Sequence, residues 1–497
     1  MEKDTGPDTS RDTMAEHVEK GNDSIENLEA SLPPGGEDSL VVKKLIRRLD
    51  WTLLPFLALL YLLSFLDRTN IGNARLDTFE ADLGMTGLAY NNALAIFFPF
   101  YVIAEVPVNI LMKRFSPYMV IGAMMIAWGI VCTLMGIVQN YHGLLAARAV
   151  LGLTEGGLFP AVSYYITMWY RRHECGLRLA IFFSAATIAG AFGGLLARGV
   201  LEMRGVAGLE GWRWLFILEG IVTVLVAILA FRFVQDYPEK ARCLNEEERE
   251  IIVTRLQLDR SSLANDFNIR YVKDAFLDWK IWTHCVITIC VYTGVYSYSL
   301  FLPTIIRDLG YTAAQANLMT VPPFVLACTV CVAGGWYADR LQQRGIFMIV
   351  FLVTALIGLI MLISTSTVGV RYAGCFIAAA GIYPAVPQGV AWNGNNIGGS
   401  LKRGVGIAMH VGFGNISGIV SSYIFLTRDS PRFFRGLGTL CGLYVFALVL
   451  CVVMTAYLRY ENRRRDRTHP APDSYTDEQK ALEREKGDNA TFFRFTI

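Results

Sequence analysis

Apolar residues in this sequence are gathered into blocks, separated by short polar stretches. A helix needs about 20 consecutive apolar residues to cross the hydrocarbon core of a membrane. Twelve blocks of roughly this length follow one another along the chain, which predicts an all-α membrane protein with twelve transmembrane helices. The expected spans are residues 51–71, 90–112, 117–138, 141–169, 178–200, 212–235, 281–304, 317–338, 346–366, 371–392, 403–427 and 436–458.

The longest polar stretch between two spans divides the twelve into two sets of six. This division predicts two six-helix halves with a solute path between them. The sequence before the first span and after the last is polar and charged, which is typical of flexible tails. The expected parts are a disordered cytoplasmic tail (1–48), a first half (49–235), a cytoplasmic linker (236–278), a second half (279–460) and a cytoplasmic tail (461–497).

The linker contains one expected helix. Asn245 is followed three residues later by Glu248, which is the spacing of a helix-capping pair. Ile251, Ile252 and Leu256 then fall on one helical face. The pattern predicts an amphipathic helix on the cytoplasmic surface, and a solvated tether between the halves is the alternative.

Charge supports a membrane protein and restricts its partners. Charged residues make up 18% of the chain, below the roughly 25% of soluble proteins. The formal net charge of +2 gives no indication of nucleic-acid binding. A basic cluster at 43–48 precedes the first span, so the positive-inside rule places this end in the cytoplasm, and an even number of spans returns the other end to the same side. We expect a monomer in the plasma membrane with both termini cytoplasmic.

The sequence carries no sign of an enzyme. Most of the ten cysteines lie within apolar spans, which argues against a disulfide framework. Cys328 and Cys331 form a C-x-x-C pair, but no His or further Cys accompanies them, so no metal site is predicted. A phosphate-binding P-loop, an H-E-x-x-H zinc motif and a nucleophile elbow are all missing from the sequence. We therefore expect no cofactor, with the proton gradient as the driving force.

Two pairs of charged residues lie inside expected spans. Arg148 and Glu155 are two helical turns apart and face the same side of one helix. Because an ionisable side chain at membrane depth is costly, these two should line a solute path, and a static salt bridge between helices is the alternative. Asp67 and Arg68 fall late in the first span, at the expected depth of Arg148, whereas Glu155 should lie nearer the midplane. Asp67 and Arg68 could also form an end cap or a self-satisfied pair.

Several motifs resemble those of known transporters. Gly335-x-x-x-Asp339-Arg340 resembles the loop motif of the major facilitator superfamily, and Arg148-x-x-x-Gly152-x-x-x-Gly156 is similar to its fourth-span motif. The resemblance narrows to the fungal allantoate permease group of anion:cation symporters, which includes transporters of nicotinate, pantothenate, biotin and allantoate. It covers about 50–460 and rests on the stretches at 66–74, 211–214, 392–396 and 412–415.

This resemblance implies roles for particular residues. Gly335, Asp339 and Arg340 would control the balance between inward-open and outward-open states, whereas Lys113 replaces the Asp usual in the corresponding first-half loop. An Asp-Arg pair in span one couples protonation to substrate binding in the related carboxylate symporters. The resemblance therefore implies that Asp67 takes part in proton coupling and Arg68 in substrate binding, and Tyr101 matches an aromatic position facing the cavity. From charge and depth we expect Glu155 to bind the proton and Arg148 to exchange between Glu155, Asp67 and a substrate anion, because an arginine fork matches a carboxylate and stays protonated.

The second half offers further polar and aromatic groups in its spans. Tyr292, Tyr296 and Tyr298 supply hydroxyls and ring faces, although aromatic residues in a span can also serve packing. Candidate substrate ligands here are Tyr292, Tyr296, Asn393, His410 and Asn415, with hydrogen bonding between helices as the alternative for the amides and the histidine. In the first half, Glu105 could take part in proton movement or make a structural polar contact.

Together these features predict a secondary active transporter. We expect proton-coupled uptake of a small organic anion, such as a vitamin-like carboxylate. Export of a secondary metabolite or toxin on the same scaffold is the first alternative. A nutrient sensor that binds solute without moving it is the second.

Overall fold

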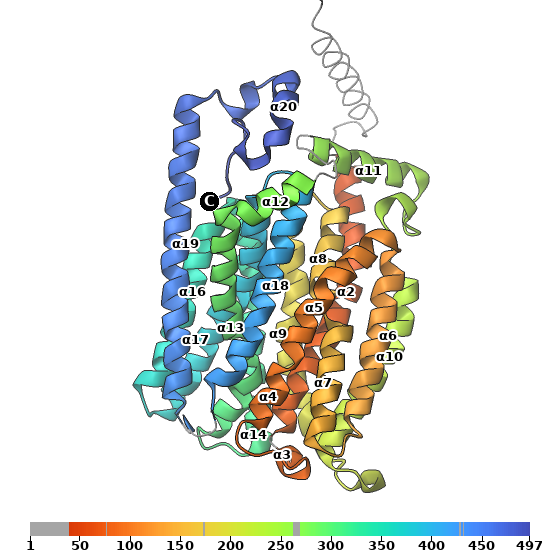
Figure 1. Cartoon of the computed structure of the whole chain (residues 1–497), viewed down its shortest axis with the longest axis vertical. Helices are drawn as coiled ribbons and strands as arrows, with labels where there is room; N and C mark the ends of the chain where they lie inside the picture. Colours follow the sequence, from red (N-terminus) through yellow and green to blue (C-terminus); the bar gives the residue numbers. More distant parts are fainter. Residues whose placement is uncertain (1–38, 76, 172–173, 262–268, 427–428, 431) are drawn as a thin grey trace, which may run out of the picture.

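The computed structural model describes residues 39–75, 77–171, 174–261, 269–426, 429–430 and 432–497, and this part of the chain is helical without any β-strand. Figure 1 shows the long helices running side by side along the long axis of the molecule. Its upper end, where α2 (Leu40–Ala74) begins and α19 (Phe434–Thr468) ends, is called the terminus end below. The predicted tail at 1–38 lies outside the described residues.

The predicted twelve-span fold is confirmed. Among the described residues, eleven helical segments are long and apolar enough to cross a membrane. The remaining expected span, 90–112, is present as two helices, α4 (Ala89–Ala95) and α5 (Phe97–Arg114), which meet at Ile96. Two other spans are also interrupted. In the first half one span consists of α7 (Tyr141–Glu155) and α8 (Leu158–Trp169), and in the second half one consists of α14 (Ala313–Met319) and α15 (Val321–Leu341).

The other helices have the following bounds. In the first half they are α3 (Phe79–Asp82), α6 (Pro117–Met135), α9 (Cys175–Leu201), η3 (Val206–Gly208) and α10 (Gly211–Phe233). The linker holds η4 (Pro238–Lys240), α11 (Glu246–Ser261) and α12 (Ile269–Leu277). In the second half they are α13 (Trp279–Arg307), α16 (Arg344–Ser364), α17 (Val368–Asn395) and α18 (Ser400–Ile424), followed after α19 by η6 (Pro472–Ser474), α20 (Asp477–Glu483) and η7 (Arg484–Asn489).

The linker helix α11 lies across the terminus end and is tied to the first half (Figure 1). The backbone N–H of Asn245 donates to the Glu248 carboxylate at 2.9 Å, as the capping pattern requires. The same carboxylate accepts from Arg48 of α2 at 2.6 Å. Ile252 and Leu256 are buried. The apolar face of α11 therefore packs inward, as an amphipathic helix should.

The C-terminal tail is folded, in contrast to the flexible tail expected from its charge. Asp488 accepts hydrogen bonds from the ammonium groups of Lys280 (2.5 Å) and Lys402 (2.6 Å) at the terminus end of the second half. The Phe495 ring is buried, and Arg465 stacks on it at 4.7 Å. The charges of the tail are thus paired with charges on distant helices, which a local composition argument does not capture.

Candidate functional site

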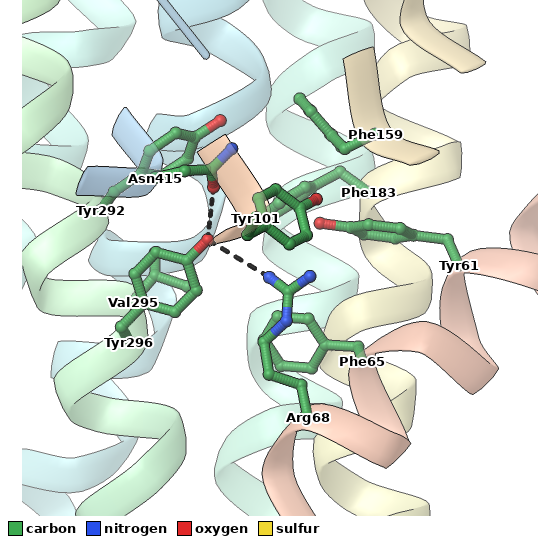
Figure 2. A pocket seen from close by; sticks show the side chains of 10 residues that line it. All are labelled: Tyr61, Phe65, Arg68, Tyr101, Phe159, Phe183, Tyr292, Val295, Tyr296 and Asn415. Carbon is green, nitrogen blue, oxygen red and sulfur yellow. Dashed lines mark hydrogen bonds between the residues drawn. The ribbon is translucent and has the colours of Figure 1, made fainter. Parts of the chain in front are cut away.

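A small cavity is lined by residues of both halves. Its walls are mostly aromatic, with one guanidinium and one amide as the strongest polar groups. Figure 2 shows the side chains that surround it. They are Tyr61, Phe65 and Arg68 of α2, Tyr101 of α5, Phe159 of α8, Phe183 of α9, Tyr292, Val295 and Tyr296 of α13, and Asn415 of α18.

Arg68 is the centre of the site. Its Nη2 lies 2.7 Å from Oε1 of Glu155, and both side chains are almost wholly buried. Its Nη1 donates to the Tyr296 hydroxyl of the other half at 3.2 Å, and its Cζ lies 4.8 Å from the Tyr101 ring centroid. The guanidinium is therefore held by one carboxylate and by aromatic faces, an environment that suits a cation.

A helix break positions Glu155. Helix α7 ends at Glu155, and Gly157, which follows two residues later, has φ +106°, a conformation that favours glycine. At Gly156 a Cβ would lie 2.4 Å from the carbonyl oxygen of Tyr101, so only glycine allows α5 to come this close. The hydroxyl of Ser64 donates to the Glu155 carboxylate at 2.6 Å. The carboxylate thus sits at a helix end, next to the cavity, with two donors from α2.

Asp67 does not join this ion pair, contrary to expectation. Its carboxylate accepts hydrogen bonds from the Trp128 indole at 3.0 Å and the Thr223 hydroxyl at 3.2 Å, and from the Cys132 thiol at 3.4 Å. Consecutive residues of a helix point about 100° apart, so Arg68 faces the cavity while Asp67 faces α6 and α10. Asp67 therefore lies in the packed interior of the first half.

Arg148 also lies apart from the cavity, although it is buried. Its Nε donates to the carbonyl oxygen of Ala93 at 3.2 Å, and its Nη1 has no hydrogen-bond partner among the described residues. Both guanidinium groups lie over the Phe97 ring, with centroid distances of 5.1 Å to Arg148 Cζ and 5.2 Å to Arg68 Cζ. In this arrangement Arg68 pairs with Glu155, and the exchange of Arg148 between Glu155 and a substrate stays a prediction.

The second-half candidates fall into two groups. Tyr292, Tyr296 and Asn415 line the cavity, and the Tyr296 hydroxyl donates to Oδ1 of Asn415 at 2.5 Å. Asn393 instead donates to the carbonyl oxygen of Gly406 at 3.2 Å, and the His410 ring contacts the Thr288 hydroxyl at 2.7 Å, both away from the cavity. Asn393 and His410 thus make hydrogen bonds between helices, which the sequence analysis gave as the alternative to substrate binding.

The loop motif lies at the terminus end, where the halves meet. The Asp339 carboxylate accepts from the backbone N–H of Leu177 at 2.7 Å, in the first turn of α9. A helix N-terminus favours a negative charge. Asp339 also pairs with Arg344, whereas Arg340 stacks on Trp336 at 5.4 Å. A Cβ at Gly335 would lie 2.7 Å from the Cβ of Ala180, so this glycine permits the close approach of α15 to α9.

Several aromatic residues that line the cavity were not identified from the sequence. Tyr61, Phe65 and Arg68 occur at i, i+4 and i+7, which places them on one face of α2. This spacing could have identified the two aromatic residues once Arg68 was a candidate. Phe159 and Phe183, from other helices, offered no comparable signal.

Comparisons with known proteins agree with this architecture. The family model described as Major Facilitator Superfamily matches residues 57–422. The MFS-type transporter cnsO of Penicillium expansum is 35% identical over 474 residues, which cover 92% of this chain and 90% of that protein. An uncharacterized transporter of Schizosaccharomyces pombe, C1002.16c, is 34% identical over 449 residues, covering 90% of this chain and 88% of the relative.

Solved structures show the same fold at low sequence identity. The proton:xylose symporter XylE matches with a TM-score of 0.61 and 15% identity, covering 83% of this chain and 95% of XylE. A bacterial homologue of the human lysosomal transporter Spinster, in an inward-facing and occupied conformation, matches with a TM-score of 0.59 and 16% identity, covering 84% of this chain and 98% of that one. With its helical fold, its central cavity and these relatives, the chain is a membrane transporter that belongs to the major facilitator superfamily.

Proposed function

We propose that this transporter is a proton-coupled symporter of a small organic anion, with a carboxylate as the recognised group. The observation that carries the proposal is the position of Arg68, which is the only lysine or arginine among the described residues that line the cavity. A guanidinium offers a planar fork that matches a carboxylate. Uptake across the plasma membrane, with both termini in the cytoplasm, belongs to the same proposal.

Coupling follows from competition for Arg68. A substrate carboxylate that binds the guanidinium draws it away from Glu155, its buried partner at 2.7 Å. A buried carboxylate without a cation is costly, so Glu155 then binds a proton. The Ser64 hydroxyl can remain in contact with either form, because a hydroxyl both donates and accepts. Substrate binding thus favours proton binding, and by linkage the reverse holds.

The walls of the cavity favour a flat substrate. Tyr61 and Phe65 lie on the same face of α2 as Arg68, and Phe159 and Tyr101 line the cavity from other helices (Figure 2). Aromatic faces stack on planar groups and bury large areas. The motifs shared with the allantoate permease group support the same class, since its transporters carry nicotinate, pantothenate, biotin or allantoate.

Asp67 has a different role in this proposal. Its three donors suit an ionised carboxylate that fastens α2 to α6 and α10. We assign the substrate-linked proton to Glu155 and a structural role to Asp67.

The test is uptake of a labelled carboxylate panel into proteoliposomes with and without a pH gradient. The panel contains nicotinate, pantothenate, biotin and allantoate. Accumulation of one member that requires an inward proton gradient supports the proposal. Equal accumulation without the gradient contradicts proton coupling, and movement of every panel member at the protein-free rate contradicts the substrate class.

A further inference from the structure

Glu105 is a buried carboxylate that the proposed symport mechanism does not use. It lies on α5 one turn after the cavity residue Tyr101, and 5% of its surface is exposed. Its Oε1 accepts a hydrogen bond from Nδ2 of Asn415, on α18 of the other half. Among the described residues, no lysine or arginine forms an ion pair with it. The ionised form therefore depends on an amide that belongs to the opposite half.

Helix α18 is shaped to receive this carboxylate. Gly412 and Asn415 are one turn apart and face the same side of α18. A Cβ at Gly412 would lie 3.0 Å from Oε2 of Glu105. Gly412 thus gives the carboxylate room beside the helix backbone while Asn415 supplies the donor.

The same amide connects Glu105 to the ion pair at the cavity. Oδ1 of Asn415 accepts from the Tyr296 hydroxyl at 2.5 Å, so its NH₂ group must point toward Glu105. The Tyr296 hydroxyl in turn accepts from Arg68 at 3.2 Å, and Arg68 binds Glu155. One chain of hydrogen bonds therefore joins the carboxylates of Glu105 and Glu155. Figure 2 shows its middle part, from Arg68 through the Tyr296 hydroxyl to Asn415.

We propose that Glu105 is a second proton-binding residue of the transport cycle, gated by the docking of Asn415 across the interface between the halves. This inference rests on the proposed symport. When α18 withdraws, Glu105 loses its amide donor, and a carboxylate without this donor binds a proton before water replaces α18 around it. When α18 returns, the amide donates to the carboxylate again and the proton leaves to water. The only covalent bond that forms and breaks in this step is the O–H bond of the Glu105 carboxyl.

The neighbouring groups permit this behaviour. Arg68 is the charged group that faces Glu105, and its guanidinium already forms an ion pair with Glu155. The helix packed behind α5, α7, presents glycines to it. The remaining titratable groups that face Glu105 are the phenols of Tyr101, Tyr292 and Tyr296.

The test is infrared difference spectroscopy of the purified full-length protein in lipid as pH is varied, which needs no substrate. Absorption by a protonated carboxyl that is lost in Glu105→Gln identifies the Glu105 signal. Asn415→Ala removes the donor permanently, so the Glu105 signal should persist to a pH about one unit higher or more, the effect expected from losing a hydrogen bond to a charged group. If Asn415→Ala does not fold, Gly412→Ala provides the same test by pushing the carboxylate from α18.

Glu219 is the matched control, because its carboxylate accepts from the Asn70 amide within one half. Its signal, identified with Glu219→Gln, should be unchanged by Asn415→Ala. The inference is overturned if Glu105→Gln removes no titrating signal, or if loss of the Asn415 donor leaves the Glu105 midpoint where it was. Gradient-driven uptake combined with either result would refute this inference alone. Absence of uptake would refute the symport proposal and with it the place of Glu105 in a transport cycle, while leaving intact the titration of Glu105 that the spectra record.

Discussion

The guanidinium of Arg68 and the carboxylate of Glu155 form a buried ion pair 2.7 Å long, at the edge of the cavity between the two halves. Removing one member of a buried pair leaves an unpaired charge at a cost of about 3–5 kcal/mol. A substrate anion that replaces Glu155 avoids this cost only if Glu155 becomes neutral. The pair is therefore where we place the link between substrate and proton.

Substitution of Arg68 by Lys should reduce carboxylate uptake about tenfold or more. Lys keeps the positive charge but lacks the planar pair of N–H donors that a guanidinium offers to a carboxylate. The loss of one hydrogen bond to a charged group costs about 1.5–3 kcal/mol. Arg148→Lys is the matched control, because Arg148 is equally buried but contacts the Ala93 carbonyl instead of the cavity. Initial uptake rates, normalised to folded protein, measure both. A larger loss in Arg148→Lys than in Arg68→Lys would reverse our assignment of the anion ligand.

Substitution of Asp67 by Asn should lower stability more than it alters coupling. The change removes a charged acceptor from three buried donors, and we expect a loss of about 1–3 kcal/mol. Thermal unfolding in detergent measures the stability. The pH profile of uptake by the folded fraction should match that of the wild type. A profile displaced by a full pH unit would show instead that Asp67 binds a coupling proton.

Substitution of Tyr61 by Leu should change substrate preference. Tyr61 packs 4.6 Å from Phe182, centroid to centroid, and presents its ring to the cavity. An aromatic contact contributes about 0.5–1.5 kcal/mol beyond area burial, so the KM for nicotinate should rise a few-fold relative to that for allantoate. Tyr460→Leu, at an exposed tyrosine of α19, should leave the ratio unchanged. An unaltered ratio in Tyr61→Leu would argue against stacking of a flat substrate.

The docked C-terminal tail should be sensitive to acid through Asp488. Burial alone would raise the pKa of Asp488, but the ammonium groups of Lys280 and Lys402 hold it below its ordinary value. A carboxyl with a depressed folded-state pKa stabilises the protein above its unfolded pKa, about 3.9, and loses this effect as pH falls through the folded value. Limited proteolysis should therefore find the tail protected at neutral pH and released in acid.

Asp488→Asn should release the tail already at neutral pH, with little further change in acid. Asp466→Asn is its control, because Asp466 pairs with Arg494 through a carboxylate that is 61% exposed, and exposed pairs contribute little. Equal protease sensitivity of the two variants would contradict the role given to Asp488.

The sequence predicts the number and order of the spans well, because span length depends on local composition. The fourth-span motif includes Gly156, one of the two glycines at which that span breaks, but the break itself was not predicted. The pairing of Arg68 with Glu155 was not predictable in the same way. It depends on the rotation of α2 against α7, which places Arg68 toward the cavity and Asp67 away from it. The chain contains no local signal for that rotation.

The folded C-terminal tail was also not predictable from the sequence, because its contacts join residues that are far apart in the chain. Composition alone describes residues 461–497 as a charged and flexible segment. Asp488 pairs with Lys280 of α13 and Lys402 of α18, which are 208 and 86 residues away in sequence. Arg465 donates to the main-chain oxygen of Asp488 itself. Contacts of this kind appear only once the helices that carry the partners are packed.

The most direct test compares wild-type protein with Glu155→Gln in proteoliposomes, using the panel member that the wild type accumulates. Gln keeps the size and hydrogen bonding of Glu155 but binds no proton. The account predicts that the wild type accumulates the labelled carboxylate only under an inward proton gradient, and that Glu155→Gln exchanges it across the membrane without accumulating it. Gradient-driven accumulation by Glu155→Gln at the wild-type level would contradict the account.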